Sequence, residues 1–372
     1  PPRFQMSVGS ADCAADGTVT VQTTGARFVI APEGTIQCLQ RIPEERLVAT
    51  VSFPPVYEGT PTIAVDDDHY LCTIGPLDGP HLEVTADSVL RISPQTNAEV
   101  TVALTFAPEY FGSEMQNFFA ADATGGCGAY QVPTATGPML QRIGREGGGV
   151  FHLGADDGLL VSVFPPRPYD WDLHASERIV HDFPPLIEPG LASRPLPTDD
   201  QLREWRQFGN VLVLHLEFWD GFGIPGIQPR DPEAFEHVCD LAHELGFKVL
   251  IYTSPYFFRA TGMRGRDTST PEQYLAEMDH LLSFPVDGLY WDGIYSDVEK
   301  AWTTARLARE RLGELRLYVH CTRKPFHESR VICPFVDTWA DYLLRGEGRN
   351  REFVNADFVR FIVSGYNVGN AV

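Results

Sequence analysis

The pattern of apolar residues changes once along this chain, at a stiff proline-rich stretch over residues 165–171, and this change constrains the fold most. Before the stretch, short apolar runs are separated by turn residues, a pattern typical of antiparallel strands. After it, apolar strand-like segments alternate with helical ones, which predicts parallel strands joined by crossover helices. The sequence therefore predicts two domains, at residues 1–172 and 173–372.

The first part carries β-type runs at sandwich-like intervals and no stretch with a 3.6-residue apolar period. The predicted strands cover residues 18–22, 27–30, 47–53, 82–85, 89–93, 100–106 and 159–164. This spacing predicts an N-terminal β-sandwich.

The second part reads as repeated β/α units. The predicted strands cover residues 178–181, 211–218, 248–252, 288–291, 315–320 and 336–340, with one more from 365 onwards. The predicted helices cover residues 199–208, 232–245, 270–282, 297–312 and 351–363. Six or seven units favour a closed (β/α)8 barrel of the TIM type over an open sheet, although the tally is one or two strands short. Either the barrel is incomplete or distorted, or this chain ends before the natural one does.

The net charge of −21 disfavours partners that are themselves anionic, such as nucleic acids and anionic membranes. A neutral or cationic ligand suits this charge better. No run of 18 apolar residues indicates a membrane span, and the N-terminus has no signal-type apolar segment. The compartment stays open between the cytoplasm and secretion with the signal removed.

The seven cysteines are scattered and form neither a CxxC pair nor a His/Cys cluster at zinc spacing. Buried free thiols are expected, with one or two disulfides in the β half as the alternative. No glycine-rich phosphate loop occurs either, so we expect no cofactor and no metal.

Functional groups in barrels project from the C-terminal ends of the strands, and several acids follow predicted strands here. Asp292 directly follows an apolar strand and precedes Gly293, a position that suits a carboxylate nucleophile. The alternative is an aspartate that caps the next turn.

Asp341 is the natural second carboxylate, since two acids that flank a glycosidic bond are what glycoside hydrolysis requires. Its alternative is a structural salt bridge with Arg345 or Arg323. The rival acids are Glu217, Asp220, Asp337 and Glu347.

Aromatic residues stand beside these acids, and their ring faces could stack on sugars or could belong to the core. His320, Arg323 and Lys248 add hydrogen-bond donors. The predicted substrate-binding residues are Glu217, Trp219, Asp220, Tyr256, Trp291, His320, Arg323, Trp339 and Arg345.

A β-sandwich that leads into a barrel with Tyr290-Trp291-Asp292 and Trp339-Ala340-Asp341 resembles the retaining glycoside hydrolases of the alpha-galactosidase and alpha-glucosidase clans. The resemblance implies that Asp292 is the nucleophile and Asp341 the general acid/base. Tyr290 stands where those enzymes carry a lysine two residues before the nucleophile. Gly293 departs from the Asp-Glu pair of substrate-assisted hexosaminidases, and His320 from the glutamate of amylase-type barrels.

The sequence thus predicts a retaining glycoside hydrolase that acts on a carbohydrate. The alternatives are a non-catalytic carbohydrate-binding protein or pseudoenzyme of the same architecture, and a subunit whose barrel another chain completes. A homo-oligomer is also left open.

Overall fold

The computed structural model describes residues 4–53, 61–75, 80–94, 100–107, 110–114, 117–122, 124–133, 148–188, 191–192, 194–320, 334–344 and 370–371. Its contacts divide the chain into two compact units. The first holds the described residues up to Tyr169 together with residues 334–338. The second holds the described residues of 170–320, 339–344 and 370–371.

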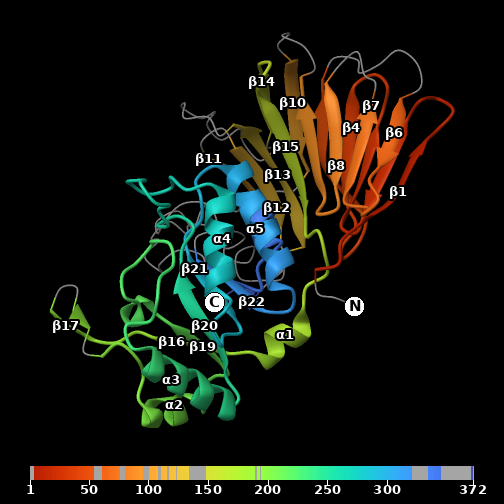
Figure 1. Ribbon diagram of the computed structural model, residues 1–372. Coiled ribbons are helices and arrows are strands. Elements are labelled where there is room, and N and C mark those ends of the chain that lie inside the picture. The colour runs from red at the N-terminus through yellow and green to blue at the C-terminus, as the bar shows by residue number, and fades with distance from the viewer. Residues whose placement is uncertain are drawn as a thin grey trace. The chain divides into compact units, whose positions relative to one another are not determined.

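The first unit consists of two antiparallel sheets (Figure 1). One sheet has the order β1 (Val8–Cys13), β2 (Val19–Thr23), β3 (Ala26–Ile30), β4 (Thr35–Gln40), β5 (Arg46–Ser52), β10 (Val100–Phe106) and β14 (Gly148–Leu153). The other has the order β11 (Tyr110–Glu114), β12 (Asn117–Asp122), β13 (Gly125–Val132), β15 (Gly158–Phe164), β9 (Val89–Ser93), β8 (His81–Thr85), β7 (Leu71–Gly75) and β6 (Thr62–Val65). Side chains from both sheets share one hydrophobic core, which is the layout of a β-sandwich.

All seven predicted strands of this unit are confirmed to within about two residues, but eight others were missed. β13 shows why, because it contains glycines where the backbones approach closely. A Cβ atom at Gly126 would lie 2.0 Å from the carbonyl oxygen of Ala120 on β12. Glycine is a poor strand signal in a sequence, although packing requires it here.

The second unit is built on one parallel sheet (Figure 1). Its order is β16 (Ile179–Asp182), β19 (Val211–Leu214), β20 (Lys248–Thr253), β21 (Gly288–Asp292), β22 (Arg316–His320), β23 (Tyr342–Leu344) and β24 (Asn370–Ala371). Among the described strands, β16 and β24 are the two edges, so the sheet is a half-barrel and a complete barrel is not seen. A two-stranded sheet of β17 (Leu186–Glu188) and β18 (Leu191–Ala192) stands apart from it.

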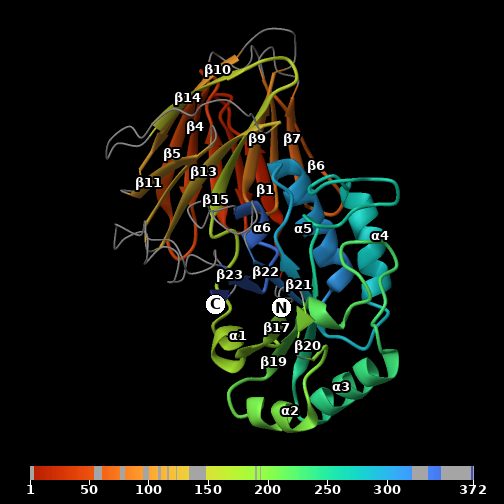
Figure 2. The ribbon, with the colours of Figure 1, turned by 90° about the vertical axis from the view of Figure 1, so that its left-hand side faces the viewer.

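The connecting helices are α1 (Trp171–Ser176), α2 (Asp199–Trp205), α3 (Pro232–Glu244), α4 (Pro271–Leu281) and α5 (Val298–Leu312). Figure 2 shows α3 and α4 on the same side of the parallel strands. Thr270 begins α4 with a capping box and Pro271 at the first helical position, as the sequence predicts. None of the helices in the described part of the chain combines the length and the apolar character that a membrane crossing requires.

Two predicted strands need correction. The segment 336–340 is not a strand, because its first two residues belong to the helix α6 (Pro334–Asp337) and β23 begins only at Tyr342. The predicted strand 211–218 ends at Leu214 and is followed by the 3-10 helix η1 (Leu216–Phe218). The predicted helix 351–363 and most of the segment from 365 onwards lie outside the described residues.

Five cysteines fall within the described residues, and all are free thiols: Cys13, Cys38, Cys72, Cys127 and Cys239. Four of them are buried, as predicted for structural thiols. Cys321 and Cys333 lie outside the described residues.

Candidate active site

The concave side of the half-barrel collects side chains from alternate positions of the parallel strands, because a strand exposes every second residue to the same face. Near the N-terminal ends these residues are aliphatic, as in Val211 and Leu250. Towards the C-terminal ends they become polar. The polar set, which we call the strand-end cluster, consists of His181, His215, Tyr252, Tyr290, Asp292, Tyr318 and His320.

Asp292 lies at the end of β21 and is 7% exposed. One carboxylate oxygen accepts a short hydrogen bond from the Tyr252 hydroxyl. The other lies 3.0 Å from Nδ1 of His320, the residue paired with it on β22. Gly293 follows with φ of 85°, so the chain turns away directly after the carboxylate, as the sequence suggested.

Tyr252 stays protonated in this setting. Burial raises the pKa of its phenol well above the ordinary value, and the negative charge of Asp292 raises it further. The hydroxyl is therefore a permanent hydrogen-bond donor to the carboxylate. Ser254, two residues on, donates to the backbone carbonyl of Asp292 at 2.5 Å and fixes the strand end.

His181 and His215 form a second pair in the cluster, with 2.9 Å between Nδ1 of the first and Nε2 of the second. His181 also lies 3.2 Å from the Tyr318 hydroxyl through Nε2. Burial lowers the pKa of His181 to about 4 and that of His215 to about 3. Both rings are therefore neutral near pH 7, and one donates to the other.

Glu217 lies next to the cluster, two residues after His215, and is half-buried. Burial raises the pKa of its carboxyl group, and the nearby charge of Asp182 raises it further. Within the described part of the chain, its Oε2 atom is buried and has no hydrogen-bond partner. The charge of Glu217 also contributes to the raised pKa of Tyr252, so both Glu217 and Asp292 act on the same phenol.

Asp341 does not join Asp292, which corrects the predicted pair of carboxylates. It precedes β23, and its backbone N–H donates to the carbonyl of Leu317 near the start of β22. Asp292 is paired with His320 at the end of that strand, so the two acids lie at opposite ends of the sheet, about 10 Å apart along the strands.

The Asp341 carboxylate is 1% exposed and lies 2.7 Å from Arg309 and 2.8 Å from the backbone nitrogen of Leu317. The alternative of a structural salt bridge is therefore correct, although its partner is Arg309 on α5. Lys248 also lies at the N-terminal end of its strand, 3.3 Å from Glu177, which binds Arg316 at 2.7 Å.

The three tryptophans belong to the core, which corrects their prediction as sugar-stacking residues. Trp291 is fully buried against Tyr274 of α4, because strand alternation directs it away from Tyr290 and Asp292. Trp219 is 1% exposed and donates to the carbonyl of Tyr252 at 2.9 Å. Trp339 is 7% exposed.

The remaining predicted residues lie in several places. Tyr256 is half-buried against Phe257, with 5.0 Å between ring centroids. Asp220 is exposed, and its backbone N–H donates to the backbone carbonyl of Gln228. Asp337 is buried in the first unit. The residues Arg323, Arg345 and Glu347 lie outside the described residues.

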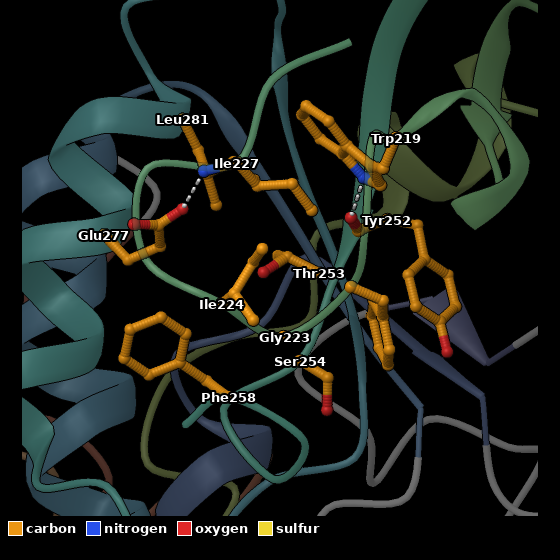
Figure 3. A pocket seen from close by; sticks show the side chains of 11 residues that line it. Trp219, Gly223, Ile224, Ile227, Tyr252, Thr253, Ser254, Phe258, Glu277 and Leu281 are labelled. Atoms are coloured by element: carbon orange, nitrogen blue, oxygen red, sulfur yellow. Dashed lines mark hydrogen bonds between the residues drawn. The ribbon is translucent and has the colours of Figure 1, made fainter. Parts of the chain in front are cut away.

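A hollow of about 270 Å³, counting its open mouth, adjoins the cluster; it shares Tyr252 with the cluster and is also lined by Ser254 (Figure 3). The other lining residues are Trp219, Phe222, Gly223, Ile224, Ile227, Thr253, Phe258, Glu277 and Leu281. The buried carboxylate of Glu277 accepts from the backbone nitrogens of Gly226 at 2.7 Å and Ile227 at 3.3 Å. This contact ties the loop after η1 to α4.

Across the described residues, no group of three or more His, Cys, Asp or Glu side chains has the arrangement to hold a metal ion.

Sequence reasoning missed His181, Tyr252 and Tyr318 as members of the cluster. The signal was present, since Tyr290 and Tyr318 stand two residues before Asp292 and His320 on neighbouring strands. The two-residue period of a strand would have placed all of them on one face.

No family model matches this chain, and no curated protein matches it. The solved structures that this chain resembles include glycoside hydrolases. The GH36 alpha-galactosidase AgaB from Geobacillus stearothermophilus is 8% identical, with 90% of this chain and 75% of that one covered and a TM-score of 0.44. The Thermus thermophilus alpha-galactosidase TtGalA is 14% identical, with coverages of 98% and 79% and a TM-score of 0.41.

The GH31 dextranase of Flavobacterium johnsoniae is 9% identical, with 96% of this chain covered and a TM-score of 0.35. This chain spans 58% of the dextranase chain. At such values these structures assign neither an activity nor a residue role to this chain, which must come from its own side chains.

Proposed function

We propose that this chain is a glycoside hydrolase in which Asp292 is the nucleophile and Glu217 the general acid/base. The observation that carries the proposal is the setting of Asp292, a carboxylate at a strand end held by a phenol on one oxygen and an imidazole on the other. Such donors orient a carboxylate for attack and stabilise its charge between turnovers.

Glu217 takes the role that the sequence suggested for Asp341. A general acid must hold a proton at the working pH, and burial raises the pKa of Glu217 in that direction. Its buried Oε2 has no hydrogen-bond partner among the described residues, which leaves that oxygen to a ligand. Both acids act on Tyr252, one by a hydrogen bond and one by its charge.

The reaction then runs in two balanced steps. Asp292 attacks the anomeric carbon to form a glycosyl ester while Glu217 gives its proton to the departing oxygen. Glu217 next takes a proton from water, the hydroxyl displaces Asp292, and the sugar leaves with its original anomeric configuration. The neutral imidazole of His215, whose Nε2 pairs with His181, can offer its Nδ1 to a sugar hydroxyl without adding charge.

The test is release of sugar from a panel of glycosides by the wild type and by Asp292→Asn, Glu217→Gln and two matched controls. The controls are Asp240→Asn and Glu236→Gln, which change exposed carboxylates on α3. We expect both site variants to lose at least about a thousandfold in kcat and both controls to keep it. Azide should restore turnover to Asp292→Ala as a glycosyl azide. An Asp292→Asn variant with wild-type activity would contradict the proposal.

A second candidate function is carbohydrate binding without catalysis. The position of Asp341 favours it, because the predicted partner of Asp292 is at the other end of the sheet. Sugar binding by the wild type with no product from any glycoside of the panel would select this candidate.

A further inference from the structure

A line of aromatic rings extends from the strand-end cluster, and two of its members, Phe183 and Phe222, take no part in the proposed chemistry. Phe183 follows β16 and is 66% exposed, although its ring centroid lies 3.8 Å from that of His215. His215 lies 5.3 Å from Tyr252, and Tyr252 lies 5.3 Å from Phe222 in the loop after η1. We call Phe183, His215, Tyr252 and Phe222 the aromatic row.

A single exposed phenylalanine needs no explanation, because surfaces carry many. Phe183 differs because its contacts lead without a break to the candidate nucleophile. Its ring lies on His215, His215 packs on Tyr252, and Tyr252 binds Asp292. Phe208 provides the contrast. It is 70% exposed, but it precedes β19 and so lies at the N-terminal end of the sheet.

The position of the proposed general acid, Glu217, indicates which part of a glycoside would contact the aromatic row. Glu217 must lie on the side of the departing oxygen, and it follows His215 by two residues. The group attached to that oxygen therefore points towards the end of β19 and the neighbouring end of β16, where His215 and Phe183 lie. Exposed Leu216 and Ile224 add apolar surface at the end of β19 and in the loop after it.

Flat apolar groups gain most from such a surface, since aromatic rings attract each other beyond their simple burial. The imidazole of His215 in the middle of the row is neutral, so it stacks without the cost of desolvating a charge. A hydroxyl-rich sugar suits the polar cluster below, and an aromatic group suits the row.

We infer that the aromatic row is a binding site for a flat, apolar aglycone, and that the substrates are glycosides of aromatic alcohols. This inference rests on the proposed function for the placement of the sugar. It adds Phe183 as a specificity-determining residue that acts through stacking.

The test compares binding of benzyl and methyl 1-thioglycosides, whose sulfur link resists cleavage, across the galactose, glucose and xylose series in both anomeric forms. Titration calorimetry gives the ratio of the two dissociation constants for each sugar. We expect the wild type to bind a benzyl compound about tenfold more tightly than its methyl counterpart. Phe183→Ala should bring this ratio near one, and Phe183→Trp should retain it.

Phe208→Ala is the matched control and should keep the wild-type ratio, since it removes an equally exposed ring at the other end of the sheet. The inference is overturned if Phe183→Ala keeps the ratio, if the wild type does not distinguish the two compounds, or if it binds neither. Failure of the proposed function is a separate result. In that case no O-glycoside is cleaved, while the benzyl preference and its loss in Phe183→Ala persist.

Discussion

Replacing Asp341 by asparagine separates a structural role from a catalytic one. The substitution keeps the volume of the side chain and removes its charge. The Arg309 guanidinium, 4% exposed for the whole residue, would then be buried without its counterion. Removing one partner of a buried ion pair typically costs about 3 to 5 kcal/mol of stability.

The contacts around the pair place the cost at the lower end of this range. The asparagine carbonyl can still accept from the backbone nitrogen of Leu317. Arg309 keeps the carbonyls of Trp339 at 3.0 Å, Leu315 at 2.8 Å and Gly313 at 3.2 Å. We therefore expect a loss of about 3 kcal/mol.

Tryptophan fluorescence is the appropriate assay, because all six tryptophans lie at residue 171 or later and belong to the second unit. The signal thus reports unfolding of the half-barrel without interference from the sandwich. With a urea dependence of about 1 to 3 kcal/mol per molar, the midpoint should fall by about 1 to 3 M. The double variant Asp341→Leu/Arg309→Met should recover most of the loss, because it leaves no buried charge.

An Asp341→Asn variant that unfolds at the wild-type urea concentration would refute this reasoning. If that variant also lost sugar release, Asp341 would belong to the active site and the choice of Glu217 would be wrong.

Three further predictions concern the strand-end cluster and its loop. The pKa values of His181 and His215 are lowered below the unfolded value near 6.5, so the free energy of unfolding should be highest above pH 6.5. It should fall towards pH 4 by up to about 1.4 kcal/mol per pH unit for each ring. Urea midpoints that do not change between about pH 6.5 and pH 4 would count against buried neutral rings. Tyr252→Phe removes a donor to Asp292 and should lower kcat about 10- to 100-fold with an unchanged urea midpoint, whereas an unchanged kcat would deny the hydrogen bond a role. Glu277→Gln should speed hydrogen exchange at the two loop amides that the carboxylate holds by at least about fivefold, and equal exchange rates in variant and wild type would show that the contact does not restrain the loop.

The parts of the fold with strong local signals could be predicted from the sequence. Thr270 and Pro271 mark the start of α4, and Gly313 with φ of 54° ends α5. Such capping residues act through their own backbone, so the sequence alone reveals them. β13 was missed because its glycines are required by the close approach of a neighbouring strand, and the sequence does not identify that neighbour.

Asp292 was placed correctly at a strand end because an apolar run and Gly293 bracket it. Asp341 was misplaced because the apolar residues on either side of it allow a strand before or after it. The helix α6 occupies the first position and β23 the second, which moves the acid to the other end of the sheet. Burial of Trp291 likewise follows from packing on α4, which no local pattern encodes.

Ion pairs hold the N-terminal end of the half-barrel together: Asp341 pairs with Arg309, and Glu177 pairs with both Arg316 and Lys248. Those contacts involve none of the residues that line the opposite end. If Phe183 selects the ligand as inferred above, mutagenesis can therefore vary Phe183 and its neighbours while these ion pairs remain intact. The residues at the C-terminal ends of the parallel strands can in this way change independently of the ion pairs at the N-terminal ends.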